Sequence, residues 1–118
     1  MTRGCLLIVL FLPFVSYAQA DSGFAVDPER GRIVATVRCM QCHHLSTLSR
    51  SIGPGLKGVY GRAPTISGVP FAVWDEAALD AWLTDPRAVK ANTRMQLPPI
   101  VARDRADIIA WFKSEREK

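Results

Sequence analysis

Two cysteines separated by two residues and followed directly by a histidine constrain this chain more than any other feature. The run is Cys39-Met40-Gln41-Cys42-His43. This spacing is the attachment signal for a c-type haem, because two thioethers reach the two vinyl groups on one porphyrin edge and the next residue falls beneath the iron. A redox dithiol or half a zinc site would use the same spacing. The first favours a strand-helix-strand pattern and the second needs two more well-spaced ligands, and the sequence offers neither. The motif therefore predicts one covalent haem c, anchored by Cys39 and Cys42, with His43 as an iron ligand.

The first 20 residues predict an export signal. Arg3 gives a positive start, residues 5–15 are almost continuously apolar, and Ala18-Gln19-Ala20 has the small-x-small pattern that signal peptidase cuts. A retained membrane anchor is the alternative, but the apolar run is shorter than the ~18 residues that span a bilayer. We expect cleavage after residue 20, which leaves a periplasmic domain of residues 21–118 that does not span the membrane.

The charge balance points to a protein partner. The chain has a formal net charge of +4, and its basic residues are scattered among acidic ones. This pattern does not favour nucleic acid, which an exported protein rarely meets. An acidic patch on another protein is the expected partner surface.

The local signals predict an all-α chain. Asp27-Pro28 and Asp85-Pro86 combine an N-cap with proline at the first helical position, and we expect helices over residues 28–39 and from residue 86. Asp75 predicts a helix to about residue 84, and Asp104 is expected to cap the last helix. Gly31 lowers helix stability, so a close helix crossing is the expected reason for it.

Apolar spacing predicts which helix faces are buried. Trp74, Ala78, Leu79, Trp82 and Leu83 share one face, and on the last helix Ile108, Trp111 and Phe112 lie opposite Arg105, Lys113 and Glu117. Residues 49–70 are rich in Gly, Pro, Ser and Thr and predict a long loop. A loop of this length in a small domain needs something to organise it, and a buried cofactor would do so.

The second iron ligand is predicted by elimination. Besides the lysines, only Met40, His44 and Met95 remain as donors beyond the leader. Met40 is confined within the attachment loop, and His44 directly follows the first ligand on the same side. Met95 lies in a loop downstream and is free to reach the other face. A histidine–methionine pair raises the reduction potential.

Several motifs in register resemble class I cytochrome c, and the mitochondrial-type branch in particular. The resemblance runs from Gly31 to about Arg116 and implies a small all-α fold of three to four helices around one covalent haem, with crossing terminal helices. The matching features are Gly31, the segments at residues 52–62 and 74–83, Pro86, the run Thr93-Arg94-Met95 and residues 107–112.

The resemblance also implies roles for individual residues. The Pro54 carbonyl is expected to accept a hydrogen bond from His43, which would strengthen the imidazole as a ligand. Arg62, Trp74 and Thr93 are expected to hydrogen-bond the inner haem propionates. Trp82 and Leu83 are expected to form the wall beside the Met95 sulfur.

Two departures from the family pattern are visible. The chain is shorter between Arg62 and Trp74, so much of the loop that covers the lower haem edge is missing, and greater exposure tends to lower the potential. Where the family commonly has an aromatic residue on the first helix this chain has Ala35, and we expect the Trp111 ring to fill the space.

These features predict a single-electron carrier between redox proteins such as a dehydrogenase, a cytochrome complex or a terminal oxidase. A haem subunit bound to one periplasmic dehydrogenase is the alternative. A haem enzyme or gas sensor with a displaceable Met95 is a further alternative, although the sequence offers no distal acid or base. The chain would be a monomer or a subunit of such a complex. A basic rim is expected to steer docking to the acidic partner, and it consists of Arg38, Lys57, Arg87, Lys90 and Arg94.

Overall fold

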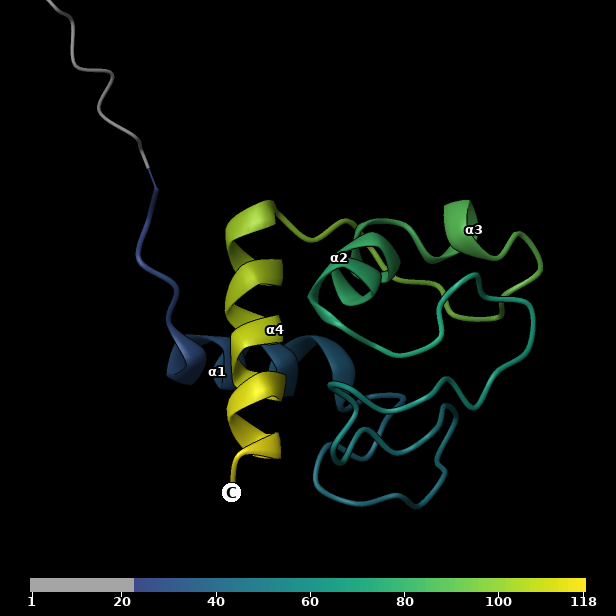
Figure 1. The fold of residues 1–118 in the computed structure, drawn as a ribbon, viewed down its shortest axis with the longest axis horizontal. Helices are drawn as coiled ribbons and strands as arrows, with labels where there is room; N and C mark the ends of the chain where they lie inside the picture. Colours follow the sequence, from purple (N-terminus) through teal and green to yellow (C-terminus); the bar gives the residue numbers. More distant parts are fainter. Residues whose placement is uncertain (1–22) are drawn as a thin grey trace, which may run out of the picture.

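The computed structural model describes residues 23–118 and contains four helices and no strand within that range. The predicted export signal at residues 1–20 lies outside the described residues. Figure 1 shows two crossing helices, α1 and α4, on one side, with α2, α3 and long connecting loops on the other. The expected all-α fold is confirmed.

Three helices begin where aspartate caps predict them. Helix α1 (Pro28–Cys39) begins after Asp27, whose side chain accepts hydrogen bonds from two backbone N–H groups. The carboxylate of Asp75 caps α2 (Glu76–Thr84) in the same way, and that of Asp85 caps α3 (Pro86–Val89). Each carboxylate satisfies a donor that the helix itself leaves unpaired.

The predicted start of the last helix is wrong. Helix α4 (Ala102–Arg116) begins two residues before Asp104, and its N-cap Val101 makes no side-chain hydrogen bond. Asp104 lies in the first turn, where its carboxylate pairs with Arg30 of α1. A negative charge in the first turn still favours the helix through its dipole.

The two terminal helices cross at Gly31, as predicted. A Cβ atom at this position would collide with the backbone carbonyl of Asp107. Ala35 and Ile108 are fully buried, and Trp111 is 9% exposed and stacks on Phe112 with ring centroids 5.2 Å apart. That the Trp111 ring compensates for the small Ala35 side chain stays a prediction.

An ion-pair cluster ties the same two helices together. The Asp107 side chain is fully buried and accepts a hydrogen bond from the Asp27 backbone N–H at 2.8 Å. Its other oxygen pairs with Arg30, which also pairs with Asp104. The hydrogen bonds that Arg30 donates to Asp104 and then to Asp107 hold the pKa of Arg30 above its ordinary value. One guanidinium thus neutralises a carboxylate that water does not reach.

Arg105 does not lie on the solvent-facing side of α4, where the helical pattern placed it. Its side chain is 16% exposed, and its Nε donates to Asp80 of α2 at 2.7 Å. Its Nη1 donates to the Ile100 carbonyl, also at 2.7 Å. The residue therefore joins α4 to α2 and to the segment that precedes α4.

The apolar face of α2 is buried as predicted. All five residues of the predicted stripe, from Trp74 to Leu83, belong to the core. The rings of Trp74 and Trp82 meet edge to face at a centroid distance of 5.5 Å.

The long loop from residue 49 to residue 70 contains no helix or strand but is organised by backbone hydrogen bonds. Lys57 N–H donates to the Thr47 carbonyl at 3.3 Å. At the base of the shortened segment, Gly61 N–H donates to Trp74 and Trp74 N–H donates to Arg62, at 2.8 and 2.9 Å. This pairing closes the segment with Arg62 and Trp74 side by side.

No helix among residues 23–118 is both long enough and apolar enough to cross a membrane.

Candidate haem-binding site

The cysteine pair lies in a tight turn at the end of α1. The backbone N–H groups of Cys42 and His43 both donate to the Cys39 carbonyl, at 3.1 and 2.9 Å. Cys39 is buried, Cys42 is exposed, and neither forms a disulfide. Met40 is 58% exposed and lies outside the core, and its exclusion as an iron ligand stays a prediction.

The environment of Cys39 does not support a redox dithiol. Burial raises the pKa of the Cys39 thiol to about 11. A reactive dithiol needs a lowered pKa, because only the thiolate is nucleophilic. The Cys39 thiol is therefore protonated at neutral pH. The zinc alternative would need further ligands, and residues 23–118 contain no group of three or more His, Cys, Asp or Glu side chains placed to hold a metal ion.

The His43 ring is held in one orientation by the loop at residues 51–54. Its Nδ1 lies 2.7 Å from the Pro54 carbonyl oxygen, so the protonated Nδ1 donates this hydrogen bond and Nε2 keeps its lone pair. A Cβ atom on Gly53 would collide with the ring, so only glycine fits here. Gly53 N–H also donates to the Cys42 carbonyl at 2.7 Å. The loop thus fixes both the position and the tautomer of His43. The His44 side chain, in contrast, is exposed.

The predicted second ligand lies on a separate loop, between α3 and α4. The indole Nε1 of Trp82 donates a hydrogen bond to the Met95 sulfur at 3.1 Å. Met95 N–H donates to the Thr93 hydroxyl oxygen at 3.2 Å. The structure therefore places Trp82 beside the sulfur, as the resemblance implied.

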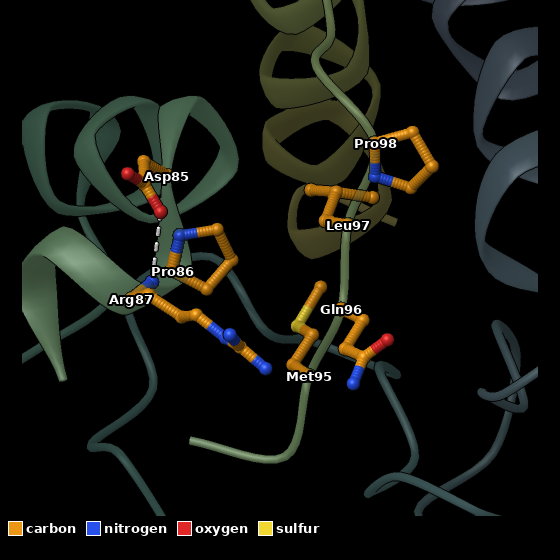
Figure 2. Close-up of a pocket in the computed structure, with 7 residues that line it drawn as sticks. All are labelled: Asp85, Pro86, Arg87, Met95, Gln96, Leu97 and Pro98. Carbon is orange, nitrogen blue, oxygen red and sulfur yellow. Dashed lines mark hydrogen bonds between the residues drawn. The ribbon is translucent and has the colours of Figure 1, made fainter. Parts of the chain in front are cut away.

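A pocket of about 450 Å³ opens beside Met95. Figure 2 shows Met95 on the loop and Arg87 on α3, whose side chain extends toward Met95 in this view. Arg87, which we expected only in the basic rim, therefore also lines the pocket. The lining residues are Asp85, Pro86, Arg87, Met95, Gln96, Leu97 and Pro98.

Arg62 has a donor without a partner. Its Nη1 donates to the Lys57 carbonyl at 2.7 Å and its Nη2 to the Gly55 carbonyl at 2.9 Å. Its Nε is buried and has no hydrogen-bond partner within the described chain. Buried donors are nearly always satisfied, so this nitrogen indicates an acceptor that the polypeptide does not supply. A carboxylate such as a haem propionate is an acceptor of that kind.

The structure brings the predicted residues together in three local groups. His43 and Pro54 form the first, Met95 with Trp82 and Thr93 the second, and the backbone-paired Arg62 and Trp74 the third. Contact between Trp74 and Trp82 joins the last two groups.

Two contacts near the site were not predicted. Phe71 packs on Trp74 with ring centroids 5.6 Å apart, and no periodic pattern surrounds it in the loop. Arg38, assigned only to the basic rim, donates to the carbonyl of Pro99 at 2.7 Å. The two adjacent prolines that follow Met95 were a signal for this contact, since such a segment lacks N–H groups but keeps its carbonyl acceptors.

The residues present fit a covalent haem. The turn holds two free thiols, and the imidazole of His43, with a free Nε2, follows them. The Met95 sulfur lies on another loop, and the buried Arg62 Nε has a hydrogen to donate and no acceptor within the described chain.

Comparison with known proteins identifies the family. No protein-family model matches the chain. It is 35% identical to cytochrome c of Euglena viridis over 101 residues, which cover 77% of this chain and 99% of the relative. The chain belongs to the class I cytochrome c family. This cytochrome is also 33% identical to cytochrome c 2.1 of Caenorhabditis elegans over 104 residues, covering 80% and 94% of the two chains. A bacterial relative, cytochrome c2 iso-2 of Magnetospirillum fulvum, is 35% identical over 86 residues, or 64% and 90%.

Family membership confirms the expected class of protein. As a class I cytochrome c, the chain is an electron-transfer protein and not an enzyme, and its cofactor is one covalently bound haem c.

Proposed function

We propose that this cytochrome is a periplasmic one-electron carrier whose haem is attached through Cys39 and Cys42 and whose iron ligands are His43 and Met95. The haem, when bound, supplies reversible one-electron chemistry at its iron. The polypeptide attaches it, supplies both ligands and sets the polarity around it.

The orientation of His43 carries this proposal. With Nδ1 committed to the Pro54 carbonyl at 2.7 Å, the ring presents Nε2 as its only lone pair. A histidine ligand commonly makes such a bond with its other nitrogen, which fixes the tautomer and raises the basicity of the ligating nitrogen. Since Gly53 packs directly against the ring, the histidine has little freedom to adopt another arrangement.

The surroundings of Met95 support a closed coordination. The Trp82 N–H orients the thioether sulfur, and the Thr93 hydroxyl oxygen holds the Met95 backbone. Trp82 and Leu83 are buried and apolar, and neither is an acid or base that could assist peroxide chemistry. This arrangement favours electron transfer over the enzyme and gas-sensor alternative.

Arg62, Trp74 and Thr93 are proposed to bind the propionates. The unpaired Arg62 Nε supports the first assignment, and the Thr93 hydroxyl keeps a free hydrogen to donate. The two carbonyls that accept from the Arg62 Nη atoms fix the direction of its buried Nε.

Docking is proposed to use the members of the basic rim whose cationic groups are not already hydrogen-bonded within residues 23–118. Lys57, Arg87 and Arg94 are exposed. Lys90 Nζ is instead bonded to the Asn92 side chain at 2.7 Å, and Arg38 is bonded to backbone carbonyls. The three free cations would attract an acidic redox partner into a transient complex.

Periplasmic location follows from the export signal proposed for residues 1–20, with residues 21–118 as the mature domain. To test location and attachment together, the full chain is expressed with a cytochrome c maturation system. We expect the periplasmic fraction to contain protein whose mass includes one haem after denaturing extraction.

Substitutions separate attachment from mere binding. The double variant Cys39→Ser/Cys42→Ser should lose all haem on denaturing extraction, whereas the control Cys5→Ser should keep it. A wild-type protein that releases its haem under those conditions would contradict the proposed attachment. A chain that keeps residues 1–20 and stays in the cytoplasm would contradict the proposed location.

A further inference from the structure

Arg38 joins α1 to the loop that carries Met95. It lies in the last turn of α1, directly before Cys39. Its Nη2 donates to the Pro99 carbonyl at 2.7 Å and approaches the Pro98 carbonyl at 3.4 Å. One exposed guanidinium therefore contacts two successive carbonyls, 60 and 61 residues away in the chain.

The segment after Met95 depends on side chains for its hydrogen bonds. Pro98 and Pro99 have no backbone N–H, and residues 95–101 form no helix or strand. Three consecutive carbonyls accept from arginines: Arg38 approaches Pro98 and Pro99, and Arg105 of α4 binds Ile100. Two guanidinium groups from the two crossing helices therefore hold residues 98–100 in place.

The position of Arg38 links the two sides of the site. The next residue, Cys39, is a proposed haem anchor, and Pro98 comes three residues after the proposed ligand Met95. Figure 2 shows that Met95, Gln96, Leu97 and Pro98 form one extended run along the pocket, so hydrogen bonds to the carbonyls of Pro98 and Pro99 restrain the segment that carries the sulfur.

We propose that Arg38 is a positioning residue that keeps the Met95 loop closed by tying it to the end of α1. The inference rests on the proposed role of Met95 as an iron ligand. Without Arg38, the loop keeps the Trp82 and Arg105 contacts but loses its connection to the attachment segment. The loop then opens more often, and Met95 leaves the iron more readily.

A surface charge and a positioning contact predict different outcomes. Arg32 lies on the same helix and is exposed, and within residues 23–118 its side chain bonds only to Glu29, with Nε to Oε1 at 3.0 Å. Arg32→Met therefore removes one positive charge from α1 without touching the loop. Arg38→Met removes the same charge together with the carbonyl contacts, and Arg38→Lys keeps the charge but loses the planar group that reaches two carbonyls.

The test is imidazole binding to the ferric holoprotein, because imidazole enters only when Met95 is displaced. We expect Arg38→Met to bind imidazole about tenfold more tightly than wild type, the effect of losing one charge-assisted hydrogen bond. The imidazole affinity of Arg38→Lys should lie between those of Arg38→Met and wild type, and that of Arg32→Met should match wild type. Once Met95 has left the iron, imidazole binds with the same affinity in wild type and the three variants. Differences in the observed imidazole affinity therefore report how often the Met95 loop opens.

Equal imidazole affinity in Arg38→Met and Arg32→Met, in proteins that all show the sulfur-to-iron charge-transfer band, would overturn the positioning role while leaving the proposed function intact. A wild-type ferric protein without that band would instead overturn Met95 ligation, and the inference with it. Thermal unfolding of each variant shows whether the effect is confined to the loop, as we expect.

Discussion

The Met95 sulfur receives its hydrogen bond from an indole, which can donate but cannot accept. The Trp82 N–H can therefore act only as a donor toward this sulfur. Hydrogen-bond donation draws electron density from a thioether and weakens its support for ferric iron. Together with the Pro54 carbonyl, which strengthens His43, it sets the electronic balance between the two proposed ligands.

Replacing Trp82 with phenylalanine removes this donor while keeping an aromatic ring. We expect the reduction potential to fall by on the order of tens of millivolts, since ~59 mV corresponds to ~1.4 kcal/mol for one electron. The control is Trp111→Phe, which changes an indole on α4 that does not touch the sulfur. Protein-film voltammetry measures both, and an unchanged or higher potential in Trp82→Phe would contradict the role given to the N–H.

At the scale of helices, short-range chemistry made three of the four helix starts predictable. Asp27, Asp75 and Asp85 cap the N–H groups of the residues that directly follow them, so the signal is complete within a few positions. The start of α4 was mispredicted because Asp104 is engaged by Arg30, 74 residues earlier in the chain. A cap signal read from sequence does not reveal such a competing partner.

The site shows the same division between local and distant information. Cys39, Cys42 and His43 could be proposed from the sequence because haem attachment requires adjacent residues in fixed spacing. Met95 could be proposed as a ligand by elimination among few donors, and both assignments stay predictions. The Arg38 contact and the inward position of Arg105 depend on how α1, α2 and α4 meet, and charged residues in a helical pattern indicate solvent exposure by default.

The crossing of α1 and α4 depends on the absence of a side chain at Gly31. Helix propensity alone predicts that Gly31→Ala raises the free energy of unfolding by about 1 kcal/mol. The new Cβ would collide with the Asp107 carbonyl and force the two helices apart. We therefore expect the free energy of unfolding to fall by at least about 2 kcal/mol overall. Denaturant unfolding measures the change. Val37→Ala, at an exposed position on the same helix, serves as the control, and a stabilised Gly31→Ala protein would show that the crossing is looser than described.

The ion-pair cluster at the crossing makes a second prediction. Arg30→Met leaves the fully buried Asp107 carboxylate without its cation, and an unpaired buried charge is strongly destabilising. We expect the melting temperature to fall by at least about 10 °C. Arg32→Met, which breaks only the exposed pair with Glu29, should lower it by no more than a few degrees. Similar losses in both variants would contradict a special role for the buried pair.

At the scale of the whole molecule, a net charge of +4 and three free cations of the basic rim predict salt-sensitive encounters with an acidic partner. The segment between Arg62 and Trp74 is closed at its base by backbone pairing, and its Gly68 lies beside the Lys90 ammonium group of the rim. Charge is expected to guide docking.

The second-order electron-transfer rate with an acidic redox protein should fall several-fold as ionic strength rises to physiological values, because screening shortens the range of attraction. Arg87→Glu should lower the rate at low salt and weaken its salt dependence. Lys118→Glu, at the C-terminal end and far from α3 in Figure 1, should change the rate much less. Stopped-flow kinetics measures these rates. Equal effects of the two substitutions would mean that net charge alone guides the encounter, and would contradict a docking role for the position of Arg87.

The proposed coordination of the iron by His43 and Met95 connects all three scales, and the ferric absorption spectrum tests it most directly. The account predicts a weak sulfur-to-iron charge-transfer band in the long-wavelength visible region. The band should vanish in Met95→Ala and persist in Met40→Ala, since the Met40 side chain is exposed on the attachment turn. A ferric wild-type protein without this band, or a band that survives in Met95→Ala, would contradict the account.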